Sequence, residues 1–99
     1  MSQTYLRFSN ALRKRLKYWR KVKGLSQVQL AEMLGMLPQQ YNNLEGGKRD
    51  PLDTDTINPE LRTLFKIALA LEVDILELLP SIFDDVEDRR LRELPKSQT

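Results

Sequence analysis

Hydrophobic residues recur every three or four positions along most of the chain, which is the spacing of one face of an α-helix. Gly24 follows a first such stretch, residues 8–23, whose apolar face consists of Phe8, Leu12, Leu16, Trp19 and Val22. No segment shows the alternation of apolar and polar residues that is typical of a β-strand. The pattern therefore predicts an all-α fold whose first helix spans about residues 8–23.

Two short helices around a tight turn are predicted next. Ser26 and Gln29 have the spacing of a capping box, in which each side chain bonds the other residue's backbone amide. This predicts a helix over about residues 27–34. Gly35 then suits the left-handed backbone conformation of a turn that ends one helix and leads into another.

A third helix is expected over about residues 38–46, because Pro38 suits a first helical position, which needs no amide donor. The stretch 46–58 is rich in Gly, Asp, Thr and Pro, and it predicts a loop. Asn58 and Pro59 have the residue types of a helix start. They predict a fourth helix whose apolar positions are Leu61, Leu64, Phe65, Ala68 and Leu71.

The last part of the chain predicts one short helix and a tail. Asp74 caps a fifth helix, which Pro80 ends. Apolar residues between 81 and 94 predict a short extra C-terminal helix. We therefore expect a five-helix domain over residues 1–80, followed by a tail, residues 81–99, that contacts a second copy or another protein.

The composition narrows the possible chemistry. The chain has 99 residues, 40% of them hydrophobic and 30% charged, which is enough for one folded core. It has no Cys and no His, so disulfides, thiolate nucleophiles, imidazole bases and the usual zinc ligands are excluded. We expect no cofactor, no metal and no enzymatic activity. No apolar run approaches the roughly 18 to 20 residues that span a bilayer, and no signal peptide is visible, so we expect a cytoplasmic protein.

The charges are divided between the two halves of the chain. Residues 1–50 carry 10 basic and 3 acidic residues, whereas residues 51–99 carry 6 basic and 11 acidic residues. Seven of the basic residues lie within eleven positions: Arg13, Lys14, Arg15, Lys17, Arg20, Lys21 and Lys23. Such a density attracts a polyanion such as nucleic acid, although a solvated helix surface explains it equally well.

The two short helices have the inward residues that a helix-turn-helix unit requires, and such a unit can present its second helix to a DNA groove. The sequence elements are Gly24-Leu25-Ser26-Gln27, Leu30-Ala31, Gly35, Leu44-Glu45, Gly47-Lys48 and Leu64-x-x-Ile67-Ala68-x-Ala70-Leu71-x-Val73. Over about residues 12–79 this arrangement resembles the phage-repressor and Cro type (XRE-like) helix-turn-helix family.

The resemblance implies that the third helix lies in the major groove of DNA. Its outward residues are four carboxamides, which can bond bidentately to N6 and N7 of adenine: Gln39, Gln40, Asn42 and Asn43. Gln39 and Asn43 hold the positions best suited to base contacts. The alternative interpretation is that these four side chains contact only solvent and keep the helix surface polar. Pro38 departs from the family, where a polar residue that contacts DNA is common.

The resemblance also implies contacts to the DNA backbone and one structural ion pair. Gln27, at the start of the second helix, would bind a phosphate, although a plain capping role is the alternative. Lys48 and Arg49 would bind a second stretch of phosphates. Arg20 and Glu45 are expected to form a buried, bidentate ion pair.

Together these features predict a sequence-specific double-stranded DNA-binding transcriptional regulator, in first place a repressor, that acts as a homodimer. The expected dimer surface, which could instead close the core of the monomer, consists of Ile75, Leu76, Leu79, Ile82, Phe83 and Val86. The alternative function is an antitoxin-like or anti-regulator module of the same fold, whose acidic C-terminal half binds a basic protein. The carboxylates Asp84, Asp85, Glu87 and Asp88 are a poor catalytic site, because no glycine loop, His or Cys assists them.

Overall fold

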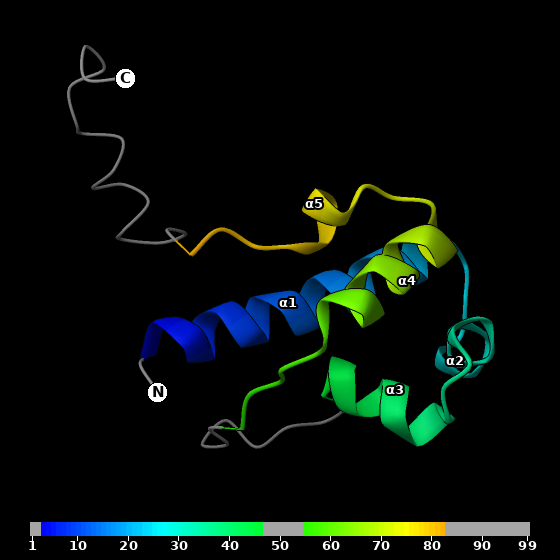
Figure 1. The fold of residues 1–99 in the computed structure, drawn as a ribbon, viewed down its shortest axis with the longest axis horizontal. Coiled ribbons are helices and arrows are strands. Elements are labelled where there is room, and N and C mark those ends of the chain that lie inside the picture. Colours follow the sequence, from blue (N-terminus) through cyan, green and yellow to red (C-terminus); the bar gives the residue numbers. More distant parts are fainter. Residues whose placement is uncertain (1–2, 47–54, 83–99) are drawn as a thin grey trace, which may run out of the picture.

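The computed structural model describes residues 3–46 and 55–82, and five α-helices lie in these two ranges (Figure 1). They are α1 (Gln3–Val22), α2 (Gln27–Leu34), α3 (Pro38–Glu45), α4 (Leu61–Leu71) and α5 (Ile75–Leu78). Neither range contains a strand, and neither contains a helix long and apolar enough to cross a membrane. The predicted five-helix, all-α fold is confirmed. The extra helix expected over residues 81–94 falls almost wholly outside the described residues.

The first helix begins at Gln3, five residues before the expected start at Phe8. The first turns of α1 bind the backbone of Ile57, which precedes α4 in the chain. The Tyr5 hydroxyl donates to the Ile57 carbonyl at 2.6 Å, and the Ile57 amide donates to Ser9 Oγ at 2.8 Å. At the other end Val22 is exposed, not inward as expected, because α1 ends there.

The turn between α2 and α3 forms as its residues predict. Both hydrogen bonds of the capping box are present: the Gln29 amide donates to Ser26 Oγ at 3.0 Å, and the Ser26 amide donates to Gln29 Oε1 at 2.8 Å. Gly35 ends α2 with a φ of 71°. The Met36 amide then donates back to the Ala31 carbonyl at 2.9 Å, and Pro38 begins α3.

Substitution of Gly35 by Ala should lower the free energy of unfolding by about 1 kcal/mol, because an L-residue pays this cost for the left-handed conformation. A Cβ atom added at Gly35 would have no neighbour within 4 Å, so no steric clash adds to the cost. Urea denaturation measures the loss. Gly35→Asn is the matched control and should lose less, because Asn tolerates this conformation. Equal losses for both variants would contradict the conformational explanation.

The fourth helix begins at Leu61, three residues after the expected cap at Asn58. Because Ile57 is bound to α1, residues 55–60 stay outside the helix, and the Glu60 carbonyl accepts its first hydrogen bond, from the Leu64 amide at 3.1 Å. Leu61 and Phe65 are two of the apolar positions that the sequence predicts on this helix. They are 72% and 54% exposed, because α4 turns a different face inward.

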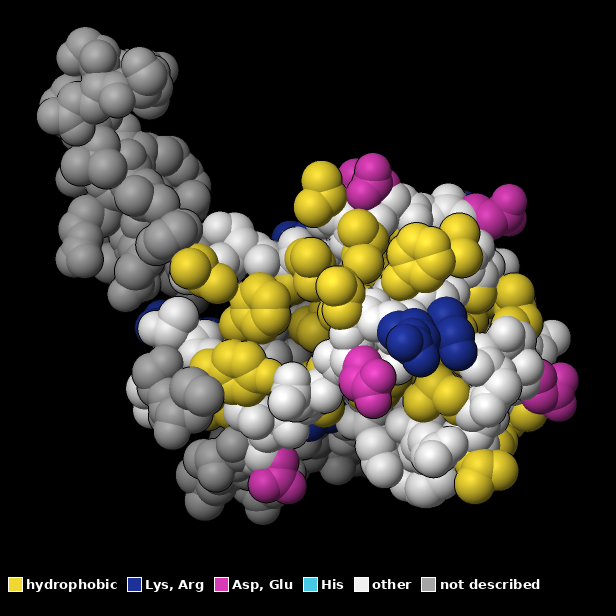
Figure 2. Space-filling view, in the orientation of Figure 1, with side chains coloured by type: hydrophobic (Ala, Val, Ile, Leu, Met, Phe, Trp, Pro, Cys, Tyr) yellow, Lys and Arg dark blue, Asp and Glu magenta, His cyan; other side chains and the backbone are white. Residues whose placement is uncertain are grey.

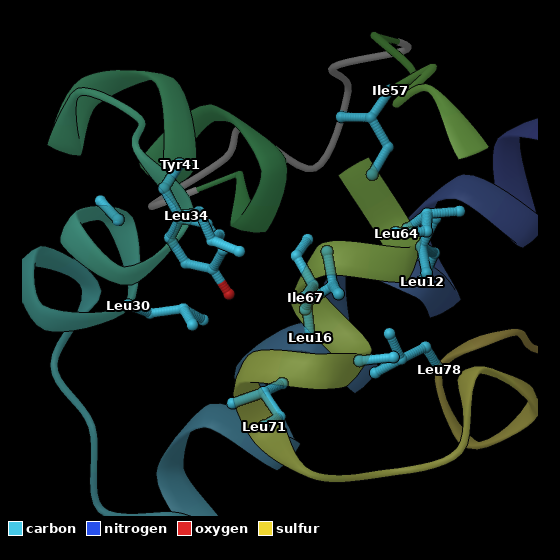
Figure 3. Close-up of a cluster of buried hydrophobic side chains, with 12 residues drawn as sticks. Leu12, Leu16, Leu30, Leu34, Tyr41, Ile57, Leu64, Ile67, Leu71 and Leu78 are labelled. Atoms are coloured by element: carbon cyan, nitrogen blue, oxygen red, sulfur yellow. The ribbon is translucent and has the colours of Figure 1, made fainter. Parts of the chain in front are cut away.

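One hydrophobic core lies between α1, the α2–α3 unit and α4, and α5 closes one side of it (Figures 1 and 3). Leu12 and Leu16 of α1 face Leu64 and Ile67 of α4 in this core, and Leu30, Leu34 and Tyr41 reach it from the helix-turn-helix unit (Figure 3). The short α5 is capped by Asp74, whose Oδ1 accepts from the Leu76 amide at 2.9 Å.

Candidate nucleic-acid interface

The third helix presents its carboxamides to the outside and its aromatic side chain to the core. Tyr41 is fully buried, and burial together with the neighbouring Glu45 carboxylate raises the pKa of its hydroxyl. Among the four residues expected to contact bases, Gln39, Gln40 and Asn43 are exposed. The fourth, Asn42, is half-buried. Helix α3 therefore carries an outward polar surface on a well-packed base.

The four carboxamides differ in what already binds them. Gln39 Nε2 donates to Asn43 Oδ1 at 3.0 Å, so these two residues form one linked pair on the outward face. Gln40 Oε1 accepts from the Leu37 amide at 2.9 Å and so caps the start of α3. Asn42 lines a hollow beside Arg13. The Gln39–Asn43 pair thus consists of two exposed side chains on the outward face of the helix.

A buried ion pair joins the end of α3 to α1. Arg20 Nε and Nη2 donate to the two Glu45 carboxylate oxygens at 2.6 and 3.0 Å, and only 8% of Arg20 and 7% of Glu45 is exposed. Arg20 Nη1 also donates to the Leu25 carbonyl at 2.8 Å. The bidentate contact expected from the sequence is present in the structure. It fixes α3 relative to the loop before α2.

The environment of Glu45 sets its charge state. Burial alone would raise the pKa of this carboxyl, but hydrogen bonds from Arg20 and Gln27 outweigh burial and hold the pKa below its usual value. The hydrogen bond to Glu45 likewise raises the pKa of Arg20. Both groups therefore stay charged at neutral pH.

Gln27, expected to bind a phosphate, also belongs to this buried cluster. Its Nε2 donates to Glu45 Oε1 at 2.9 Å, and its side chain is half-buried at the first position of α2. One N–H of the carboxamide is therefore committed to the ion pair. This contact has no direct signal in the sequence, because Gln27 and Glu45 are 18 positions apart and lie on different helices.

Substitution of Gln27 by Ala should lower the free energy of unfolding by about 1.5 to 3 kcal/mol without any DNA present, because a hydrogen bond to a charged group is lost. The measurement is chemical denaturation of the free protein. Gln39→Ala is the control, because its carboxamide is exposed and bonds only a surface neighbour. If Gln27→Ala is as stable as the parent, then Gln27 has no positioning role and only the phosphate contact would remain.

The basic cluster of α1 divides into structural and exposed residues. Arg13 is 6% exposed and donates through Nη1 to the Asn43 carbonyl at 2.7 Å, so it holds the end of α3. Arg15 Nη1 lies 3.3 Å from each of the Glu77 and Leu79 carbonyls beside α5. With Arg20, three of the seven basic residues serve the fold. The exposed remainder is Lys14, Lys17, Lys21 and Lys23.

Some expected contact residues lie outside the described ranges, namely Lys48, Arg49, Phe83 and Val86. Within the described part of the expected dimer surface, Ile75 and Leu79 are half-buried against the core, where they close the monomer. Leu76 and Ile82 are instead 71% and 52% exposed. The expected surface is therefore divided between core and exterior.

Comparison with known proteins identifies a family and a similar solved structure. The helix-turn-helix family matches residues 16–78, which include all of α2, α3, α4 and α5. A solved structure of the restriction-modification controller protein C.AhdI from Aeromonas hydrophila is 31% identical, with a TM-score of 0.58, and the match covers 71% of this chain and 94% of that chain. The search of curated proteins gave no match.

Proposed function

The chain belongs to the helix-turn-helix family, and on this premise we propose that it is a sequence-specific double-stranded DNA-binding transcriptional regulator, acting as a repressor and as a dimer. The proposed reading element is α3, which enters the major groove. The observation that carries the proposal is the outward Gln39–Asn43 pair on a helix that Arg20 and Arg13 hold in place from behind.

The Gln39–Asn43 pair keeps hydrogen-bonding groups that can bind a base. With Gln39 Nε2 bonded to Asn43 Oδ1, the Gln39 carbonyl oxygen and the Asn43 amino group remain as an acceptor and a donor. Adenine offers the complementary pattern in the major groove, a donor at N6 and an acceptor at N7. The pair supports recognition of A·T base pairs, and its internal bond reduces the rotamer freedom lost on binding.

Contacts to the DNA backbone would come from the start of α2 and from basic residues that follow α3 in the sequence. Helix N-termini bind phosphate through free backbone amides and the helix dipole. Gln27 keeps a second N–H beside that terminus while the first is bound to Glu45. Lys48 and Arg49, which follow α3 in the sequence, are proposed to bind a second phosphate stretch. Such contacts give affinity and register, whereas the bases give specificity.

A dimer would supply the specificity that one helix lacks. A single recognition helix reads only a few base pairs, and two copies related by a two-fold axis read half-sites about one DNA turn apart. A protein that occupies such a site over a promoter excludes the transcription machinery, which is why we propose repression. The similarity to a restriction-modification controller protein supports a regulatory role.

The test is a fluorescence-anisotropy titration with DNA from upstream of the protein's own gene and with random DNA, across a salt series. We expect a specific dissociation constant near 10⁻⁸ M or below and a preference over random DNA of about a thousandfold or more. A steep salt dependence should accompany both, because phosphate contacts release counterions. If binding sites selected from a random pool show no enrichment and the affinities for both DNAs are equal, the proposal is wrong.

A further inference from the structure

A hollow on the surface lies between the N-terminal half of α1 and the segment that follows α5. Two exposed cations of α1, Arg7 and Lys14, line this hollow together with the half-buried Phe8. Ser81 and Ile82 form part of its opposite wall. We refer to it as the α1 hollow. It combines positive charge with apolar surface, so it suits a ligand that carries negative charge beside apolar groups.

The chain that follows α5 runs along α1 toward the N-terminus of that helix (Figure 1). The Trp19 indole Nε1 donates to the Glu77 carbonyl at 3.2 Å, and Arg15 Nη1 lies 3.3 Å from the Leu79 carbonyl. Two residues of this segment therefore pass about one turn of α1, in the reverse direction. Residues 81–82 continue the course, because they line the α1 hollow. The chain thus leaves the described residues at this hollow.

The next residues of the sequence complement the α1 hollow, although they lie outside the described ranges. Four of the five positions from 84 to 88 are acidic, and we refer to these five residues as the acidic segment: Asp84, Asp85, Val86, Glu87 and Asp88. Helix α1 contains no acidic residue, so each of its charged side chains attracts this segment. Phe83 and Val86 add apolar groups that match Phe8 and Ile82 in the hollow.

We propose that the α1 hollow binds the acidic segment of the same chain. An extended chain advances about 3.3 to 3.6 Å per residue, so Asp84 lies within about 7 Å of Ile82 and Asp88 within about 22 Å. Lys14 and Arg7 are separated by about 10 Å along α1. The acidic segment can therefore reach both cations while it keeps the direction in which the chain leaves α5.

Covalent attachment distinguishes this occupant from an acidic segment of another protein. A short linker holds a segment near its site at an effective concentration on the order of mM. An exposed ion pair is weak, and it changes an equilibrium constant by a factor of only about 1.4 to 5. A few such pairs with Arg7 and Lys14 suffice for a segment that is already held nearby, and they do not suffice for a separate protein at low concentration.

Both partners of the proposed contact belong to parts of the chain outside residues 16–78, which match the helix-turn-helix family. The α1 hollow is lined by residues between 4 and 14 and by residues 81–82. In Figure 1, α1 lies between α3 and the segment that follows α5. The bound acidic segment would therefore leave the Gln39–Asn43 pair open, and its binding does not depend on the proposed function.

The test measures the backbone order of the acidic segment in the full-length protein by nitrogen-15 NMR relaxation. In the parent, the order parameters should be about 0.8, close to the value of a rigid backbone, because α1 holds the segment. In a neutral-tail variant they should fall below about 0.6, as in a flexible backbone. This variant carries Asp84→Asn, Asp85→Asn, Glu87→Gln and Asp88→Asn. The parent should show the same loss at about 1 M salt, where charges are screened beyond about 3 Å.

Charge reversal in the α1 hollow tests where the segment binds. Arg7→Glu, Lys14→Glu should lower the order parameters of the acidic segment as the neutral-tail variant does. The matched control is Lys17→Glu, Lys21→Glu, which has the same net charge but changes exposed lysines of α1 that do not line the hollow. This control should keep the order parameters of the parent, because the charges that contact the segment are unchanged.

A charge-swapped protein should regain the order that Arg7→Glu, Lys14→Glu loses, because opposite charges face each other again. It combines these two substitutions with Asp84→Lys, Asp85→Lys, Glu87→Lys and Asp88→Lys. The inference is overturned if the acidic segment is flexible in the parent, if the neutral-tail variant keeps its order, or if both charge-reversed proteins lose it equally. The neutral-tail variant decides the matter even if Arg7→Glu, Lys14→Glu fails to fold, because its substitutions lie outside the five helices.

Discussion

Glu45→Gln should lower the free energy of unfolding by about 3 to 5 kcal/mol, because it leaves the Arg20 guanidinium buried and without an opposite charge. Arg20 keeps only 8% of its surface exposed, so water cannot replace the lost carboxylate without disturbing the core. For a domain of this size the loss corresponds to a melting temperature roughly 12 to 40 °C lower. Differential scanning calorimetry and urea denaturation measure it.

Two further variants separate the ion pair from general sensitivity to mutation. Glu60→Gln removes an exposed carboxylate just before α4 and should change stability by no more than about 0.5 kcal/mol. The double variant Arg20→Met, Glu45→Leu removes both charges and should be more stable than Glu45→Gln, because an apolar pair leaves no unpaired charge. A Glu45→Gln protein that melts like the parent would show that the pair contributes nothing.

The ion pair also predicts how stability depends on pH. The pKa of Glu45 lies lower in the folded protein than in the unfolded chain, where it is about 4.3. Its contribution is therefore complete above that value and is lost as the pH falls through the folded pKa. The stability difference between the parent and Glu45→Gln should be constant from pH 7 to about pH 5 and should shrink below about pH 4.

Gln39→Ala and Asn43→Ala should each weaken binding to specific DNA by about 5- to 150-fold, the range that corresponds to 1 to 3 kcal/mol for a bidentate base contact. Binding to random DNA should stay within about twofold, because these side chains read bases and not phosphates. Their effects should not add in the double variant, since the two side chains are bonded to each other. Fluorescence-anisotropy titrations with specific and random DNA measure the dissociation constants of the parent, the two single variants and the double variant.

The matched control for these variants is Lys17→Ala, which removes an exposed cation of α1. If Lys17 attracts DNA, its loss weakens specific and random DNA equally and reduces the salt slope. Equal losses for both DNAs in Gln39→Ala would mean that the pair contacts the backbone, which contradicts base recognition. Unchanged melting temperatures would show that the losses arise in binding.

The parts of the fold that follow local rules could be predicted from the sequence. The bounds of α2, the turn at Gly35 and the start of α3 at Pro38 depend on residues within four positions of one another. Capping, left-handed backbone and a missing amide donor act over such short distances, so the residues involved predict them directly. The Arg20–Glu45 contact was also foreseen, but through resemblance to a family.

The features that were missed depend on contacts between distant parts of the chain. The start of α1 was placed too late because Tyr5 and Ser9 are ordered by Ile57, about 50 positions away. The sequence groups Arg13 with the basic cluster, yet Ser9, Arg13, Leu16 and Arg20 repeat at helical spacing on one face. That repeat was available in the sequence, and it would have indicated inward arginines. The two apolar faces of α4 could not be assigned, because both consist of the same residue types.

The anchoring of Ile57 has a consequence for how this chain tolerates insertions. On one side of residues 47–54, Arg13 and Arg20 bind the end of α3, and on the other side Ile57 is bound to α1. The ends of the connection are thus held independently of its length. Because doubling the length of a closed loop costs only about 0.6 kcal/mol, sequence could be gained or lost between these anchors while the domain keeps its fold.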